Sequence, residues 1–193
     1  MTAPDLSTQG ERYGAVARGL HWLIALLIVG QIAMGWTMGA VDKTTGHAIE
    51  AWHISFGVLV LILTLARIAW RLTHRAPPPA AGLKGWETGL AHAVHAGFYL
   101  LLLAIPLTGW FMESLGKRPI HVFGLVWPHF PGVAAVMAGQ DPRAVKETLE
   151  QVHGSPLVWA MIALIVLHVA GAVKHQFDGH PVLWRMLPGR GQT

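Results

Sequence analysis

Histidine is the residue type in this sequence with the greatest capacity for chemistry. The chain has 12 histidines and no cysteine, and imidazole is the commonest protein ligand for transition metals. The absence of cysteine excludes disulfides, iron–sulfur clusters held by thiolates, and covalent haem attachment through C-x-x-C-H. Four histidines stand out by their depth along the apolar segments, and a bound metal would be held by them: His21, His53, His153 and His168.

The spacing of His153 and His168 predicts metal ligands at two heights along one helix. The two residues are 15 positions apart, which on an α-helix gives a net rotation of about 60° and an axial rise of ~22 Å. One helix then presents two imidazoles to the interior of a bundle. We predict that His21 pairs with His168 and that His53 pairs with His153. Two axial imidazoles on each haem iron leave no open coordination position, which suits electron transfer.

The elements that must position these histidines are membrane-spanning helices. The chain is 53% hydrophobic and only 12% charged, whereas soluble domains average roughly 25% charged residues. Its apolar residues form four blocks, each close to the ~20 residues that a helix needs to cross the bilayer. We predict an all-α integral membrane four-helix bundle, a single domain over residues 1–193, with helices at about 19–41, 52–72, 90–112 and 156–175.

The distribution of basic residues predicts the orientation of the bundle. Short cytoplasmic loops retain positive charge, and most of the 14 lysines and arginines fall at the N-terminus, the second connection and the C-terminus. Both termini are therefore predicted to be cytoplasmic. The basic residues on that side are Arg12, Arg18, Arg67, Arg71, Arg75, Lys84, Lys174, Arg185 and Arg190.

The long third connection is then predicted to lie outside. Its FGLVWPHFPG stretch is too apolar for a free tether, so it is expected to lie against the bilayer or to cap the bundle. The following DPRAVKETLEQVHG is expected to form a short surface helix.

Small and basic residues near the histidines fit a bound macrocycle. Gly57 follows His53 by four positions and Gly171 follows His168 by three, so each glycine lies on the face of its histidine. Arg18, Arg67 and Arg71 are candidates for neutralising the inner haem propionates, because guanidinium–carboxylate pairs are favoured at low dielectric. On the outer side Lys43 is the nearest candidate, followed by Lys117 and Arg118.

Other interpretations of these residues remain open. An intramembrane histidine also serves as a hydrogen-bonded packing residue, and glycines permit close helix contact without any cofactor. A histidine-lined metal or proton transporter without haem is the alternative from a different functional class.

Several short motifs give the chain a resemblance to a known family, the bacterial cytochrome b561 proteins, which are relatives of the cytochrome b subunits of hydrogenases and formate dehydrogenases. The resemblance covers nearly the full length and implies four helices, two b haems and electron exchange with ubiquinone in the bacterial inner membrane. It also implies His21 and His168 as inner ligands and His53 and His153 as outer ligands. The motifs are LHW (20–22), WHISFG (52–57), LAHAVH (90–95), PLTGW (106–110), LHVAGAVKH (167–175) and the closing LWRMLP.

The sequence departs from the family pattern at one point. The two histidines of the last helix are one residue further apart than is usual in the family, and we expect a wide turn near Gly154 or Pro156 to absorb the extra residue. His153 is the ligand that this departure affects.

Three further histidines are predicted to lie near the cytoplasmic surface: His92, His95 and His175. We predict His95 and His175 to form a quinone site, because an imidazole can hydrogen-bond a quinone carbonyl and deliver a proton. An alternative pairing of His175 with His21 would separate the two ligands of the last helix by ~33 Å, more than the hydrocarbon core. His92 equally suits a position facing headgroups, and the remaining histidines are expected in loops.

Superoxide is the electron donor that we expect at the outer face, because a basic rim attracts a small anion. The residues of that rim would be Lys43, Lys117, Arg118, Arg143 and Lys146. Together with the resemblance, this predicts a superoxide:ubiquinone oxidoreductase. The alternative is a cytochrome b subunit of a larger dehydrogenase or hydrogenase complex, which receives electrons from a partner protein.

Overall fold

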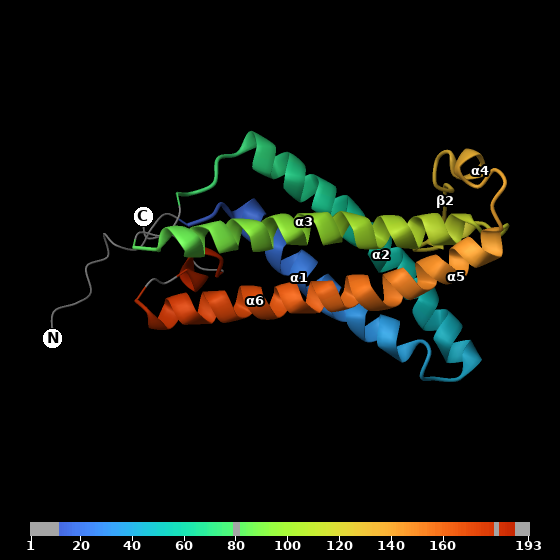
Figure 1. Ribbon diagram of the computed structural model, residues 1–193, viewed down its shortest axis with the longest axis horizontal. Coiled ribbons are helices and arrows are strands. Elements are labelled where there is room, and N and C mark those ends of the chain that lie inside the picture. The colour runs from blue at the N-terminus through green and yellow to red at the C-terminus, as the bar shows by residue number, and fades with distance from the viewer. Residues whose placement is uncertain (1–11, 79–81, 180–181, 188–193) are drawn as a thin grey trace.

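The structure is a computed structural model that describes residues 12–78, 82–179 and 182–187 (Figure 1). Four helical segments within these residues are long and apolar enough to cross a membrane: α1 (Ala15–Thr37), α2 (Lys43–Thr73), α3 (Gly85–Ser114) and the continuous segment Pro142–Phe177. Each overlaps one of the predicted spans, so the all-α, four-helix membrane fold is confirmed. The predicted cytoplasmic Arg190 and the loop residue His180 lie outside the described residues.

The fourth segment begins earlier than the sequence predicted. It consists of α5 (Pro142–Val152), a π-helical turn η2 (His153–Leu157) and α6 (Val158–Phe177). Asp141 caps its start by accepting a hydrogen bond from the backbone N–H of Arg143 at 3.0 Å, and Pro142 suits the first helical position. The expected surface helix therefore exists, but it runs directly into the fourth span.

The π-helical turn lies where the sequence predicted a wide turn. A π turn contains one residue more than an α turn, and η2 begins at His153 and includes Gly154 and Pro156. The expected wide turn is therefore present, and the helical segment continues through it without a break.

The four segments form one bundle with an apolar centre. α1 packs along α2, α2 along α3, and α3 along α6 (Figure 1). The core cluster takes residues from every segment: Ile24, Val60, Leu101, Leu102 and Met161. Large apolar side chains such as Leu26, Leu100 and Val166 point outward and are more than half exposed. Extensive exposed apolar surface of this kind suits contact with lipid.

A short hairpin covers one end of the bundle. Strands β1 (Ile120–Val122) and β2 (Leu125–Trp127) pair antiparallel, and β1 packs on α2 through Ile120, Val122 and Val58. The apolar stretch of the third connection therefore caps the bundle, one of the two predicted arrangements. We call this the hairpin end; the short helix α4 (Val133–Val136) follows the hairpin there (Figure 1).

The opposite end joins the first and last described segments, and we call it the terminal end. The indole of Trp22 donates to the carbonyl of Met186 at 2.7 Å, next to the 3-10 turn η3 (Leu183–Arg185). The backbone N–H of Tyr13 donates to the carbonyl of Arg185 at 3.2 Å, and the Arg185 guanidinium reaches the carbonyl of Pro78 at 2.6 Å. That this end faces the cytoplasm stays a prediction from the charge distribution.

Candidate metal centres

The structure brings the four intramembrane histidines together as two pairs. The ring centroids of His21 on α1 and His168 on α6 are 6.1 Å apart, with an angle of 62° between the ring planes. Those of His53 on α2 and His153 in η2 are also 6.1 Å apart, with an angle of 75°. Two metal–nitrogen bonds of about 2 Å, with roughly 1 Å more to each ring centre, place the centroids about 6 Å apart. Both pairs therefore have the separation that a shared metal ion requires.

At the hairpin end, His153 is oriented by α3. The Nδ1 atom of His153 is 3.0 Å from the Thr108 hydroxyl oxygen, and that hydroxyl donates its own proton to the carbonyl of Ile105 at 2.7 Å. The hydroxyl oxygen must therefore accept from an Nδ1–H of His153, which leaves Nε2 free for a metal. A ligating histidine is usually held by such a bond from its other nitrogen.

Glycines keep a cavity open beside this pair. A Cβ atom at Gly109 would lie 3.2 Å from the His153 ring, and one at Gly35 would lie 3.8 Å from the His53 ring. The cavity has a volume of about 290 Å³, close to the lower limit for small-molecule sites, and both histidines and Gly57 also line it. The Nδ1 atom of His53 is buried and has no hydrogen-bond partner among the described residues.

The two glycines that the sequence predicted have different surroundings. Gly57 lines the cavity, with its Cβ position 3.9 Å from the Gln31 amide nitrogen. Gly171 faces open space, because no described atom lies within 4 Å of its Cβ position. The sequence reasoning missed Gly35, Gly109 and Thr108. The last two belong to the PLTGW motif, and they lie against a histidine from another helix.

The cavity at the hairpin end has acidic edges. Its lining includes Glu50, Glu113 and Glu150, and none of the residues that line it is a lysine or arginine. Lys146 lies 4.0 Å from Glu113 and 3.8 Å from Glu150. The predicted basic rim is thus partly neutralised at this point.

Of the other residues predicted for the rim, Arg143 is paired with Glu147 at 3.1 Å. Lys117 and Arg118 are exposed next to the hairpin, and Lys43 is exposed at the start of α2.

At the terminal end, the histidine pair is extended by α3. The His95 ring lies 5.4 Å from the His168 ring, and the Phe98 ring lies 5.5 Å from it. His95 is exposed, and its Nδ1 donates to the carbonyl of Ala91 at 2.6 Å. Its other ring nitrogen is left for a ligand.

Arginines accompany this pair. Arg67 donates to the carbonyl of Ala17 at 3.1 Å and lies within electrostatic reach of His21 and His168. Arg18 donates to the carbonyl of Tyr13 at 3.0 Å. Arg71 lies one helical turn beyond Arg67, in the last turn of α2.

The structure does not place His175 against His95. His175 lies with Glu87 and Asp178, with their ligand atoms within 4.8 Å of one another. Since α3 and α6 run side by side, the seven residues from His168 to His175 put the two predicted quinone-site histidines about 10 Å apart along the bundle.

These features define a membrane-spanning four-helix protein with paired imidazoles at two levels. The chain belongs to the prokaryotic cytochrome b561 family, whose family model matches residues 12–189. This confirms the resemblance that the sequence motifs indicated, and membership in this family implies haem b as the cofactor.

Three relatives are similar over most of their lengths. Cytochrome b561 homolog 2 of Escherichia coli (strain K12) is 32% identical over 180 residues, 92% of each chain. The probable superoxide oxidase CybB of Yersinia pestis is 28% identical over 185 residues, 92% of this chain and 97% of the relative. Cytochrome b562 of Cereibacter sphaeroides is 29% identical over 152 residues, 75% of this chain and 90% of the relative.

Proposed function

We propose that the protein is a di-haem membrane electron carrier that connects a donor at the hairpin end with ubiquinone at the terminal end. His21 and His168 would be the axial ligands of one haem b, and His53 and His153 those of the other. The observation that carries this proposal is the equal separation of 6.1 Å between the rings of both pairs. When bound, the haems supply one-electron transfer at irons without an open coordination position.

The surroundings of both pairs support haem at each level. At the hairpin end, Gly35 and Gly109 provide bare backbone against the rings, and Thr108 orients His153. At the terminal end, Arg67 would neutralise propionate charge, with Arg18 and Arg71 as further candidates. Gly171 would leave room for the macrocycle on the His168 face, since its Cβ position has no neighbour within 4 Å.

A quinone site at His95 would complete the path. The His95 ring contacts His168 and is exposed, so a quinone that arrives from the bilayer would meet it there. In the imidazolium form of His95, in which both ring nitrogens carry a proton, the nitrogen that does not bond Ala91 would donate a hydrogen bond to a quinone carbonyl and supply its proton. His175 would lie about 10 Å nearer the surface, on the neighbouring helix α6.

Superoxide is the donor that we propose for the hairpin end. The similarity to a probable superoxide oxidase supports this choice, as do the exposed charges of Lys117 and Arg118. The glutamates at the cavity oppose an anion, so attraction would depend on these two residues. One electron from each of two superoxide ions would reduce one quinone, which takes up two protons.

The acidic cavity edge favours a second candidate. Three glutamates would attract a positively charged surface, such as that of an electron-donating partner subunit. In that case the chain would be the cytochrome b subunit of a larger dehydrogenase or hydrogenase complex.

Rapid mixing of the purified protein with superoxide tests the proposal. We expect the haems to become reduced, the rate to fall as salt concentration rises, and the double change Lys117→Ala, Arg118→Ala to slow reduction. Added ubiquinone should then reoxidise the haems. Absence of haem reduction by superoxide, together with copurification of a donor subunit, would instead identify the protein as part of a larger complex.

A further inference from the structure

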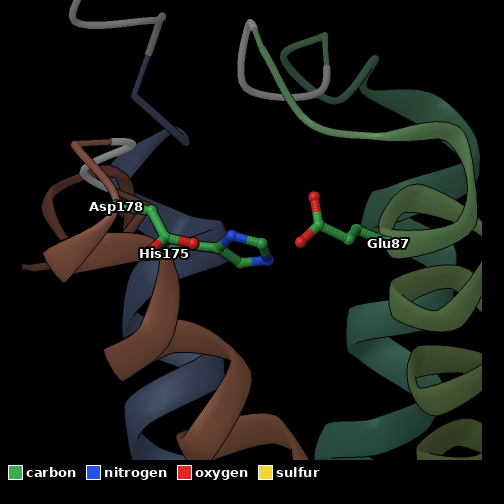
Figure 2. Close-up of side chains that lie close together, drawn as sticks. All are labelled: Glu87, His175 and Asp178. Carbon is green, nitrogen blue, oxygen red and sulfur yellow. The ribbon is translucent and has the colours of Figure 1, made fainter.

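A second group of metal-ligating side chains lies at the terminal end, away from both histidine pairs. Figure 2 shows the carboxylate of Glu87 on α3 pointing toward the imidazole of His175 on α6, with Asp178 on the same side as His175. One potential ligand atom from each residue lies within 4.8 Å of the other two. Neither Glu87 nor Asp178 has any part in the electron path described above.

Two features of this group go beyond a cluster of surface charges. The side chain of Glu87 is only 8% exposed, and one of its oxygens is held by the backbone N–H of Lys84 at 3.0 Å, so the carboxylate is fixed in place. The Nδ1 atom of His175 is buried and has no hydrogen-bond partner among the described residues. An imidazole with a buried, unpartnered nitrogen and a nearby, little-exposed carboxylate are donors suited to a cation.

The ammonium of Lys174 now neutralises both carboxylates. It lies 2.7 Å from Glu87 and 2.6 Å from Asp178, and it is 51% exposed. Lysine is a flexible point charge, so it can swing into solvent when another cation takes its place. A divalent ion would bind the two carboxylates and also His175, whereas the ammonium bonds the two carboxylates.

We propose that Glu87, His175 and Asp178 form a binding site for a divalent transition-metal ion that competes with the Lys174 ammonium. One imidazole and two carboxylates, with water as a fourth ligand, is a donor set suited to Zn²⁺. Mg²⁺ binds only oxygen ligands in a strict octahedral geometry and is not expected to replace it. The ion would join α3 to α6.

Zinc titration of the intact, haem-loaded protein in detergent tests the site. We expect one Zn²⁺ per chain that Mg²⁺ does not displace. His175→Ala should weaken binding about 100-fold or more, since even residues around a metal's ligands contribute 10–100-fold, and Glu87→Gln should also weaken it. His74 is exposed and lies outside this group, so His74→Ala is the matched control and should bind zinc as the wild type does.

Lys174→Met gives the sharpest result, because removing a competing cation should tighten zinc binding while the haem spectrum stays unchanged. Equal zinc affinity in the wild type and His175→Ala, with normal haem content in both, would overturn the site. So would weaker binding in Lys174→Met.

Occupancy of this site should also affect quinone, a consequence that rests on the proposed function. The ion would join α3 to α6 on the surface side of His95, so Zn²⁺ should slow reoxidation of the haems by quinone and leave their reduction by superoxide unchanged. Zinc binding without such slowing would refute this consequence alone. Because binding is measured without any redox partner, a failure of the proposed electron path would not affect the binding result.

Discussion

The two ends of the bundle hold similar histidine pairs in different surroundings. At the hairpin end, the pair lies beside a cavity that has glycines against the rings and glutamates at its edge. At the terminal end, the pair is in contact with a third imidazole and a phenylalanine, and an arginine lies within electrostatic reach. Ring separation is the same at both ends, and the neighbours differ. Under the proposed function, the common ligand geometry would define the electron path, and the different neighbours would decide which partner each end accepts.

Removal of single ligands should have the largest effect and should separate the two ends. His21→Ala or His168→Ala is expected to abolish haem at the terminal end alone, and His53→Ala or His153→Ala at the hairpin end alone. Each variant should retain one haem per chain by quantification of its absorption. His47→Ala, an exposed histidine at the hairpin end, is the control. Unchanged haem content in His153→Ala would move that ligand role to another residue.

Loss of the third imidazole should affect only the reaction with quinone. His95→Phe keeps an aromatic ring against His168 and removes the proton donor. General acid catalysis contributes typically 10²–10⁴-fold, so we expect reoxidation of the haems by quinone to slow about 100-fold at unchanged haem content. His92→Phe, on the same helix, is the control. Normal quinone kinetics in His95→Phe would exclude His95 from the quinone site.

Filling the space beside Gly109 should weaken haem binding at the hairpin end alone. Gly109→Val puts a branched side chain where even a Cβ would lie 3.2 Å from the His153 ring, and overpacking of this kind costs about 1–3 kcal/mol. We expect the haem content of the hairpin end to fall by half or more, while the other haem is retained. Gly89→Val on the same helix is the matched control, because the Cβ position of Gly89 has no neighbour within 4 Å. Equal haem loss in both variants would contradict a specific role for Gly109.

The smallest effect concerns the start of α2 at the hairpin end. Hydrogen bonds from the Thr45 side chain and from the backbone N–H groups of Thr44 and Thr45 lower the pKa of Asp42. The ionised Asp42 carboxylate therefore stabilises the folded protein fully above the unfolded aspartate pKa of about 3.9. This contribution is lost as the pH falls through the lower pKa of Asp42 in the folded protein.

Melting temperatures measured against pH test this contribution. Asp42→Ala should melt a few degrees below the wild type at neutral pH, and the difference should shrink in acid. Asp42→Asn retains a capping side chain without the charge and should show less of this pH dependence. A difference between Asp42→Ala and the wild type that does not change with pH would rule out ionisation as its source.

The sequence predicted the parts of the fold that depend on hydrophobic length and helical geometry. The four spans follow from apolar blocks, and both histidine pairs follow from depth and rotation along helices. The extra residue between His153 and His168 also predicted a wide turn, which the structure has in η2. These features depend on residues close together in sequence or on regular periodicity, so they can be derived from one chain.

Features that arise from tertiary contacts were not predicted. Phe123 has a φ of 51° at the hairpin turn, a conformation usually left to glycine or asparagine. Its ring packs against Phe56 and Trp52, and its N–H donates to the Ser55 hydroxyl. Likewise, Gly109 faces a histidine from another segment. Such positions depend on how the helices pack, which periodicity within one helix does not determine.

Haem quantification on the purified wild-type chain is the most direct test of the central claim that two imidazole pairs hold two haems. We expect two b haems per chain, both low-spin in the oxidised and reduced states, as full axial coordination by imidazole requires. A folded chain that retains a single haem, or one with a high-spin iron at either end, would contradict it.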